Sequence, residues 1–183
     1  MATPGTANPA KRLANKIAIV TGASTGIGAA IAQAFAREGA TVCVNWAGNE
    51  AAANVVVQAI TTAGGTAFAF QADVSKRADV EAMVVATTAR YGHLDILVNN
   101  AGVEKRAPFL EVPDDLWDHV IAVNLTGPFY CAQTAARDMA QRGIHGRIIN
   151  ISSVHEDLPM PTNAPYCASK GGLRMLMRTI CDE

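Results

Sequence analysis

Short apolar runs alternate with longer segments of helical periodicity along most of this chain. The apolar runs, rich in valine, isoleucine and other residues typical of strands, lie at 16–20, 41–46, 67–74, 94–102 and 146–153. The segments between them, in which apolar positions recur with a helical period and a glycine marks the end, lie at 29–40, 49–65, 77–92 and 113–143. A last helix is expected from about residue 164 onward.

This alternation predicts the α/β class. Strands that are apolar on both faces are typical of a parallel sheet covered by helices on both sides. We therefore expect a doubly wound parallel sheet, whose ligand crevice lies at the carboxyl ends of the strands.

The two ends of the chain differ from this regular pattern. Residues 1–15 are polar and contain proline and glycine, so we expect a flexible leader before a single domain at 16–183. Only five strands are visible where a complete fold of this type has about six. The last helix has no closing glycine, and Asp182 and Glu183 place negative charge at its carboxyl end. We therefore expect a sheet that is incomplete at its C-terminal end, in a polypeptide of poor stability and little activity.

Composition narrows the possible partners. Half of the 183 residues are hydrophobic, 17% are charged, and the net charge is −1, which favours a globular protein over a disordered or nucleic-acid-binding one. No apolar run reaches the roughly 18–20 residues that span a membrane, and no signal peptide is visible. The four scattered cysteines favour reduced thiols, a cytoplasmic location and no metal site.

A glycine-rich stretch, "VTGASTGIG", joins the first predicted strand to the first helix. Gly22, Gly26 and Gly28 would let the backbone turn tightly and approach a pyrophosphate, with Ser24, Thr25 and Ile27 between them. The glycines alone leave an ordinary strand-to-helix turn open. Their place in the first βα turn of a doubly wound chain favours a dinucleotide site.

The end of the second strand should report which dinucleotide is bound. An acidic residue there binds a free ribose 2′-hydroxyl, and a nearby arginine receives a 2′-phosphate. Trp46 stands at the expected acidic position and Ala47 follows it, so neither signal is present. We therefore expect NAD or NADP, with dual use as the hypothesis.

Six short motifs together resemble the short-chain dehydrogenase/reductase family, and their order and spacing match it over residues 15–183. They are "TGASTGIG", "ADV" at 72–74, "NNAG" at 99–102, Asn124 in "VNL", Ser153, and "YCASK" at 166–170. The resemblance implies a Rossmann-like fold, a nicotinamide cofactor and, for a full-length form, a homodimer or homotetramer.

The resemblance also implies a role for each matching residue. Asp73 and Val74 would contact the adenine, and Asn100, with Ala101 and Gly102 beside it, the adenosine side of the cofactor. The catalytic set would be Asn124, Ser153, Tyr166 and Lys170. In it, Ser153 would hold the substrate oxygen, Tyr166 transfer its proton, Lys170 hold the nicotinamide ribose, and Asn124 anchor a water.

General chemistry supports the tyrosine–lysine pair independently. Removing hydride from an alcohol carbon requires a base for the hydroxyl proton, and a free tyrosine keeps its own proton to about pH 10. A lysine one helical turn away and a positive nicotinamide ring both favour the tyrosinate. The pair alone would also suit an ordinary helix surface; Ser153 at the end of a strand favours the catalytic interpretation.

The segment between Ser153 and Tyr166 narrows the resemblance. "SSVHE", the Pro-x-Pro that follows and "ASKGG" are similar to bacterial glucose 1-dehydrogenases, which oxidise β-D-glucose to the gluconolactone. His155 and Glu156 would then contact sugar hydroxyls, or be a solvated loop pair. Two alternatives stay open: a general carbonyl or 3-oxoacyl reductase, and an inactive fragment that binds nucleotide without turnover.

Overall fold

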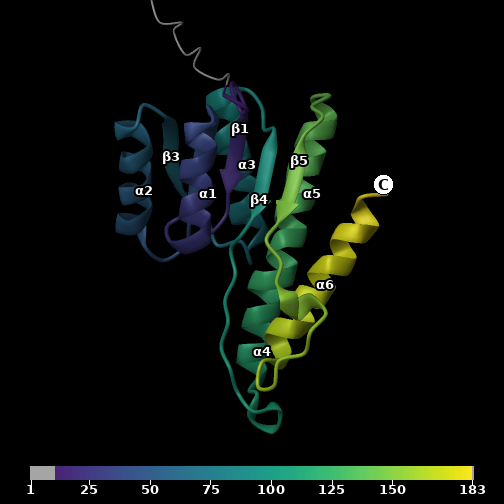
Figure 1. Ribbon diagram of the computed structural model, residues 1–183. Coiled ribbons are helices and arrows are strands. Elements are labelled where there is room, and N and C mark those ends of the chain that lie inside the picture. Colours follow the sequence, from purple (N-terminus) through teal and green to yellow (C-terminus); the bar gives the residue numbers. More distant parts are fainter. Residues whose placement is uncertain (1–10, 183) are drawn as a thin grey trace, which may run out of the picture.

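The computed structural model describes residues 11–182, which build one parallel sheet with helices on both faces (Figure 1). The strand order is β3-β2-β1-β4-β5, and every neighbouring pair is parallel. The strands are β1 (Ile17–Val20), β2 (Thr41–Trp46), β3 (Thr66–Gln71), β4 (Ile96–Asn99) and β5 (Arg147–Asn150). The long helices are α1 (Gly26–Arg37), α2 (Glu50–Thr62), α3 (Arg77–Tyr91), α4 (Asp114–Ile121), α5 (Gly127–Gln141) and α6 (Ala164–Ile180). The predicted doubly wound, Rossmann-like sheet is confirmed.

Two hydrophobic clusters hold the layers together, one on each face of the sheet. One contains the buried sides of α1 and α2, and the other those of α3 and α5. Strand β1 contributes Ala18 and Val20 to the first cluster and Ile19 to the second, because successive side chains point to opposite faces. This two-sided burial explains why the central strands read as unbroken apolar runs.

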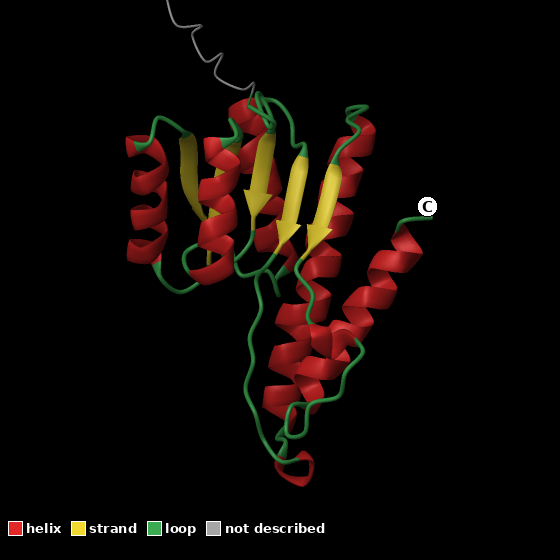
Figure 2. Ribbon diagram, in the orientation of Figure 1, coloured by secondary structure: helices red, strands yellow, loops and turns green. Residues whose placement is uncertain are grey.

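Helix α4 lies beyond the strands' carboxyl ends, where the arrowheads point in Figure 2, and α6 begins there and runs back to the level of β5. Strand β5 is at one edge of the sheet, and Ile149 on it is 40% exposed. Within the described residues, β5 therefore has a strand neighbour on one side only.

The predicted helix at 113–143 is divided by a π-helical segment, Ala122–Thr126. Pro128 explains where the break falls, because proline has no amide hydrogen to donate to the carbonyl of Asn124 four residues earlier. Asn124 therefore lies in a wider helical turn between α4 and α5.

The leader predicted for residues 1–15 needs a correction at its end, and its first ten residues lie outside the described chain. Residues 12–15 form a turn. The amide of Leu13 donates to the Glu38 carbonyl at 2.9 Å, and Arg12 pairs with the Glu38 carboxylate at 2.9 Å. The turn is tied to the end of α1 by these long-range contacts, which a local reading of composition does not reveal.

Asp95 anchors the edge of the sheet at which the strands begin, across from the carboxyl ends. It is 6% exposed, and its carboxylate accepts hydrogen bonds from Lys16 Nζ and the Ile17 amide, both at 2.8 Å. His93 Nε2 lies 2.9 Å away. Burial alone would raise the pKa of Asp95, but the hydrogen bonds and the charges of Lys16 and His93 outweigh it, so the pKa lies below its ordinary value.

We expect Asp95→Asn to lower the free energy of unfolding by about 1–3 kcal/mol at pH 7, because the amide cannot satisfy all three donors. A lowered carboxyl pKa stabilises the fold above its unfolded value of about 3.9, and that contribution is lost as the pH falls through the folded value. Urea unfolding of both proteins at pH 7 and at lower pH should show that their difference in free energy of unfolding becomes smaller in acid. The control is Asp118→Asn, an exposed site on α4; an equal effect there would contradict the anchoring role.

Candidate functional site

The glycine loop packs against the segment that follows β4, and two of its glycines leave no room for a side chain. A Cβ on Gly28 would lie 2.5 Å from Asn100 Nδ2 and 2.5 Å from the Gly22 carbonyl oxygen. Gly22 has a φ of +60°, and a Cβ there would lie 2.9 Å from the Cα of Ala101. The loop is therefore held close to residues 100–101, and the N-terminus of α1, where amides lack helical partners, lies at the crevice.

Two buried polar side chains that the sequence analysis missed hold this loop. Asn45 Oδ1 accepts from the Gly22 amide at 3.1 Å, and its Nδ2 donates to the Ala72 carbonyl at 3.0 Å. Thr21 Oγ1 accepts from the amides of Asn100 and Ala101 at 2.9 and 3.0 Å. Each is a lone polar residue at the end of an apolar strand, and that pattern is the signal that would have revealed them.

A cleft of about 730 Å³ opens at the carboxyl ends of the strands. It brings together the glycine loop, the end of β2, the segment after β3 and the segment after β4. Of the residues predicted to bind cofactor it is lined by Gly22, Ser24, Thr25, Ile27, Asp73, Val74, Asn100, Ala101 and Gly102. Gly26 and Gly28 shape the loop without lining the cleft.

The expectation that Trp46 faces the ribose needs a correction, because the structure buries this side chain. It is 9% exposed and packs in the cluster beneath α1 and α2 with Val42 and Val44. These three positions alternate along β2 and so share one face of the sheet. The residues after Trp46 line the cleft instead, namely Ala47, Gly48 and Asn49.

Asp73 and Val74 lie side by side on the cleft wall. Asp73 Oδ1 accepts from the Ser75 hydroxyl at 2.7 Å and the Ser75 amide at 3.0 Å. Burial alone would raise the pKa of Asp73. These hydrogen bonds and the charge of Lys76 have the larger, opposite effect, so the pKa lies below its ordinary value. The side chain is therefore a fixed carboxylate, beside the buried Val74.

The tyrosine–lysine pair lies on α6 as the spacing predicts. Lys170 is 6% exposed, and its Nζ lies 5.6 Å from the ring centroid of Tyr166. The ammonium donates to the carbonyl of Ile151 at 2.8 Å, which ties α6 to the end of β5. Burial lowers the pKa of Lys170, and the negative charge of Glu156 opposes that shift.

Asn124 connects the cleft to α6. It is fully buried, and its side chain accepts from the Val103 amide at 2.8 Å and donates to the Val103 carbonyl at 2.9 Å. Its Nδ2 also lies 3.2 Å from Ser169 Oγ, which donates to the carbonyl of Tyr166 at 2.7 Å. Because Val103 lines the cleft, a continuous hydrogen-bonded path joins the cleft wall to the tyrosine.

Ser153 follows β5 and caps a short 3₁₀ turn, Val154–Glu156. Its Oγ accepts from the His155 amide at 3.2 Å, so the hydroxyl proton is left to donate elsewhere. The His155 ring lies edge-on to Tyr166 with centroids 6.4 Å apart. The Glu156 carboxylate accepts from the Ser152 hydroxyl and lies 3.6 Å from Arg174. The structure thus places the serine segment against α6, beside Tyr166 and Lys170.

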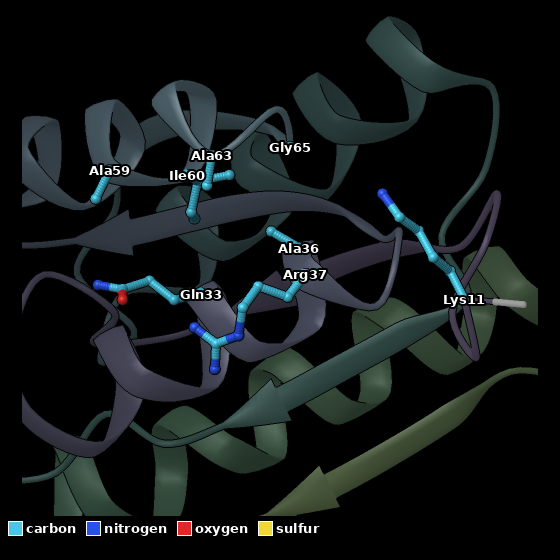
Figure 3. A pocket seen from close by; sticks show the side chains of 8 residues that line it. All are labelled: Lys11, Gln33, Ala36, Arg37, Ala59, Ile60, Ala63 and Gly65. Atoms are coloured by element: carbon cyan, nitrogen blue, oxygen red, sulfur yellow. The ribbon is translucent and has the colours of Figure 1, made fainter. Parts of the chain in front are cut away.

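A second cavity, of about 380 Å³, lies between α1 and α2 and contains none of the predicted site residues. In Figure 3 the cationic groups of Lys11 and Arg37 on its rim point in different directions. With no convergent polar groups on an alanine-rich floor, this cavity is not a candidate active site.

Residues 11–182 contain neither a metal-binding cluster of three histidine, cysteine or acidic side chains nor a helix long and apolar enough to cross a membrane. All four cysteines are free thiols, and burial raises the pKa of both Cys43 and Cys131 to about 12.

The sheet order, the glycine loop and the cleft together define a doubly wound α/β protein of the Rossmann-like class. Within that class the chain belongs to the short chain dehydrogenase family, whose sequence profile matches residues 16–183. The resemblance seen in the sequence motifs is confirmed.

Relatives within the family differ in their substrates. The chain is 45% identical over 171 residues to 3beta-hydroxysteroid dehydrogenase 1 of Eggerthella lenta, covering 93% of this chain and 66% of that protein. It is 40% identical over 173 residues to glucose 1-dehydrogenase 2 of Bacillus subtilis, with the same two coverages. The crystal structure of a gluconate 5-dehydrogenase from Burkholderia cenocepacia J2315, in complex with NADP and tartrate, is 42% identical with a TM-score of 0.87, covering 94% of this chain and 67% of that one. The chain thus spans about two thirds of the length of these proteins.

Proposed function

We propose that this chain carries the catalytic centre of an NAD(P)-dependent oxidoreductase, which moves hydride between a nicotinamide and a CH–OH or carbonyl group. The observation that carries the proposal is the Tyr166–Lys170 pair, held on α6 against the end of β5. Asn124 links that pair to the cleft that contains the glycine loop. Family membership agrees with this chemistry.

The cleft suits a dinucleotide. The loop's close approach to residues 100–101, which a Cβ on Gly28 would prevent, leaves backbone amides at the cleft wall for a pyrophosphate. A nicotinamide dinucleotide bound there would supply the hydride acceptor or donor. Asp73 and Val74 would contact its adenine, and Asn100 to Gly102 its adenosine side.

Each catalytic side chain has a distinct role in the proposal. Tyr166 transfers the proton of the substrate oxygen, with the ammonium of Lys170 5.6 Å from the centre of its ring. The Ser153 hydroxyl donates a hydrogen bond to the same oxygen, as its free proton allows. Lys170 also holds the nicotinamide ribose, and Asn124 keeps the π-helical turn in place beside it.

A sugar is the preferred substrate, with oxidation of β-D-glucose to the gluconolactone as the specific hypothesis. The "SSVHE" segment and the Bacillus relative support it. General carbonyl or 3-oxoacyl reduction is the second candidate, since the hydroxysteroid dehydrogenase of Eggerthella is at least as similar to this chain as the glucose dehydrogenase of Bacillus is. Cytoplasmic location and pairing into dimers or tetramers are further parts of the proposal.

The test is a substrate panel on the protein as its gene encodes it. Glucose, other sugars, secondary alcohols, steroids and 3-oxoacyl compounds are each assayed with NAD(H) and NADP(H). Turnover fastest on glucose supports the specific hypothesis, and turnover on carbonyl compounds alone supports the second. Nucleotide binding with no turnover on any compound would mean that the protein is a regulator and not an enzyme.

The choice between NAD and NADP should depend on Ala47, Gly48 and Asn49, which line the cleft where Trp46 was expected. We expect Gly48→Asp to reduce kcat/KM for NADP at least about 10-fold relative to NAD, because a carboxylate accepts from a free 2′-hydroxyl and repels a 2′-phosphate. A Cβ at Gly48 meets no atom within 4 Å, so the substitution should leave the fold unchanged. Steady-state kinetics with both cofactors measure the ratio, and Gly48→Ala is the matched control. An unchanged ratio would place the ribose elsewhere.

A further inference from the structure

A stripe of three side chains on α6 contacts the segment that carries Ser153. Tyr166, Lys170 and Arg174 follow one another at four-residue intervals, so they lie on one face of the helix. Tyr166 meets His155 and Lys170 binds the carbonyl of Ile151. Arg174 completes the series one turn further on.

Arg174 reaches two acidic residues next to the serine. Its Nε lies 3.6 Å from Glu156 Oε1, and its Nη1 donates to the Asp157 carboxylate. The side chains of Arg174 and Glu156 are 23% and 25% exposed, so most of their contact is shielded from water. An ion pair in this setting is screened less than one on the open surface.

The other carboxylate oxygen of Glu156 accepts from the hydroxyl of Ser152. Ser152 is the residue immediately before Ser153, so the chain of contacts runs from α6 through Glu156 to the backbone that presents the serine. Both oxygens of Glu156 face groups of this chain. A carboxylate engaged in this way is poorly placed to bind a sugar hydroxyl as well.

We infer that Arg174, Glu156 and Ser152 form a latch that positions Ser153 relative to Tyr166 and Lys170. The latch rests on the proposed function, because its purpose is to keep two groups aimed at one substrate oxygen. Ser153 follows β5 and Tyr166 lies on α6, and the two segments meet where α6 packs on the 3₁₀ turn Val154–Glu156 and where Lys170 binds the Ile151 carbonyl. The latch makes Glu156 and Arg174 positioning residues and not substrate ligands.

The alternative is that Glu156 contacts a sugar directly, as the sequence suggested. The two roles differ in what kinetics measure. A ligand to the sugar changes KM for sugars and not the turnover of an alcohol without further hydroxyls. A positioning residue changes kcat for every substrate, since a displacement of about 1 Å at the reacting centre costs on the order of 10²-fold.

The experiment compares Glu156→Gln, Arg174→Met and the double variant in the protein as its gene encodes it, using a sugar and a plain secondary alcohol. We expect kcat to fall about 10- to 100-fold in each variant, equally for both substrates, with the double variant no worse than the single ones. Arg174→Lys should recover part of the loss. Binding of the reduced cofactor, followed by its fluorescence, should stay within about twofold of the unsubstituted protein.

Arg178→Met, an exposed arginine one turn further along α6, is the matched control. If Arg174→Met keeps full kcat, or if Glu156→Gln raises KM for the sugar alone, the latch is wrong. If the unsubstituted protein itself transfers no hydride, the proposed function fails and the latch fails with it. Loss of cofactor binding in Arg174→Met would show a general structural role and would also overturn the inference.

Discussion

Replacing Tyr166 by phenylalanine should lower kcat about 10²- to 10⁴-fold, the range typical of a lost general acid–base. The ring can keep its edge-on contact with His155 and its place above Lys170, so only the hydroxyl that carries the proton is removed. Initial rates with saturating cofactor measure the loss. Cofactor binding should fall far less than kcat, because the residues that line the cleft are unchanged.

Tyr91→Phe is the control, since this tyrosine lies at the end of α3, its ring 5.6 Å from that of Phe68. It should keep full activity. A Tyr166→Phe protein with full turnover would contradict the proposed mechanism and would move the proton transfer to another group.

Gly28→Ala should weaken cofactor binding about 10- to 100-fold. The new methyl group would overlap Asn100 Nδ2 and the Gly22 carbonyl oxygen, so the loop and the segment after β4 must separate. Overpacking of this kind costs about 1–3 kcal/mol, and part of that cost appears as a lower free energy of unfolding. Fluorescence titration with reduced cofactor and urea unfolding measure the two parts.

Ala30→Ser, on the exposed side of the same helix, controls for a general effect on α1. It should bind cofactor normally. If Gly28→Ala also binds normally, the close packing of the loop is not what shapes the dinucleotide site.

Periodicity predicted most of the helices and strands, because it depends on residues close together in sequence. The helix around Tyr166 and Lys170 follows from local pattern, and the spacing alone places both on one face. The five strands follow from runs that are apolar on both faces. Strand order and the cleft could be expected only from the fold class.

What the sequence did not reveal depends on contacts between distant segments. Trp46 was expected at the ribose because it ends β2, yet strand alternation directs it into the core. Asn45 was overlooked because its partners lie on the glycine loop and after β3. Glu156 looked like a free loop carboxylate because Arg174 is a helix residue well beyond it.

The anchor at Asp95 and the candidate site lie at opposite ends of the same strands. Strand β4 runs from that carboxylate to the cleft residues that follow Asn99. Substitutions at the carboxyl ends can therefore change which alcohol is accepted while the contacts that close the amino ends stay as they are. During evolution, residues at the carboxyl ends of the strands can change substrate preference because the contacts at the amino ends stabilise the fold. The variety of substrates among its relatives agrees with that division.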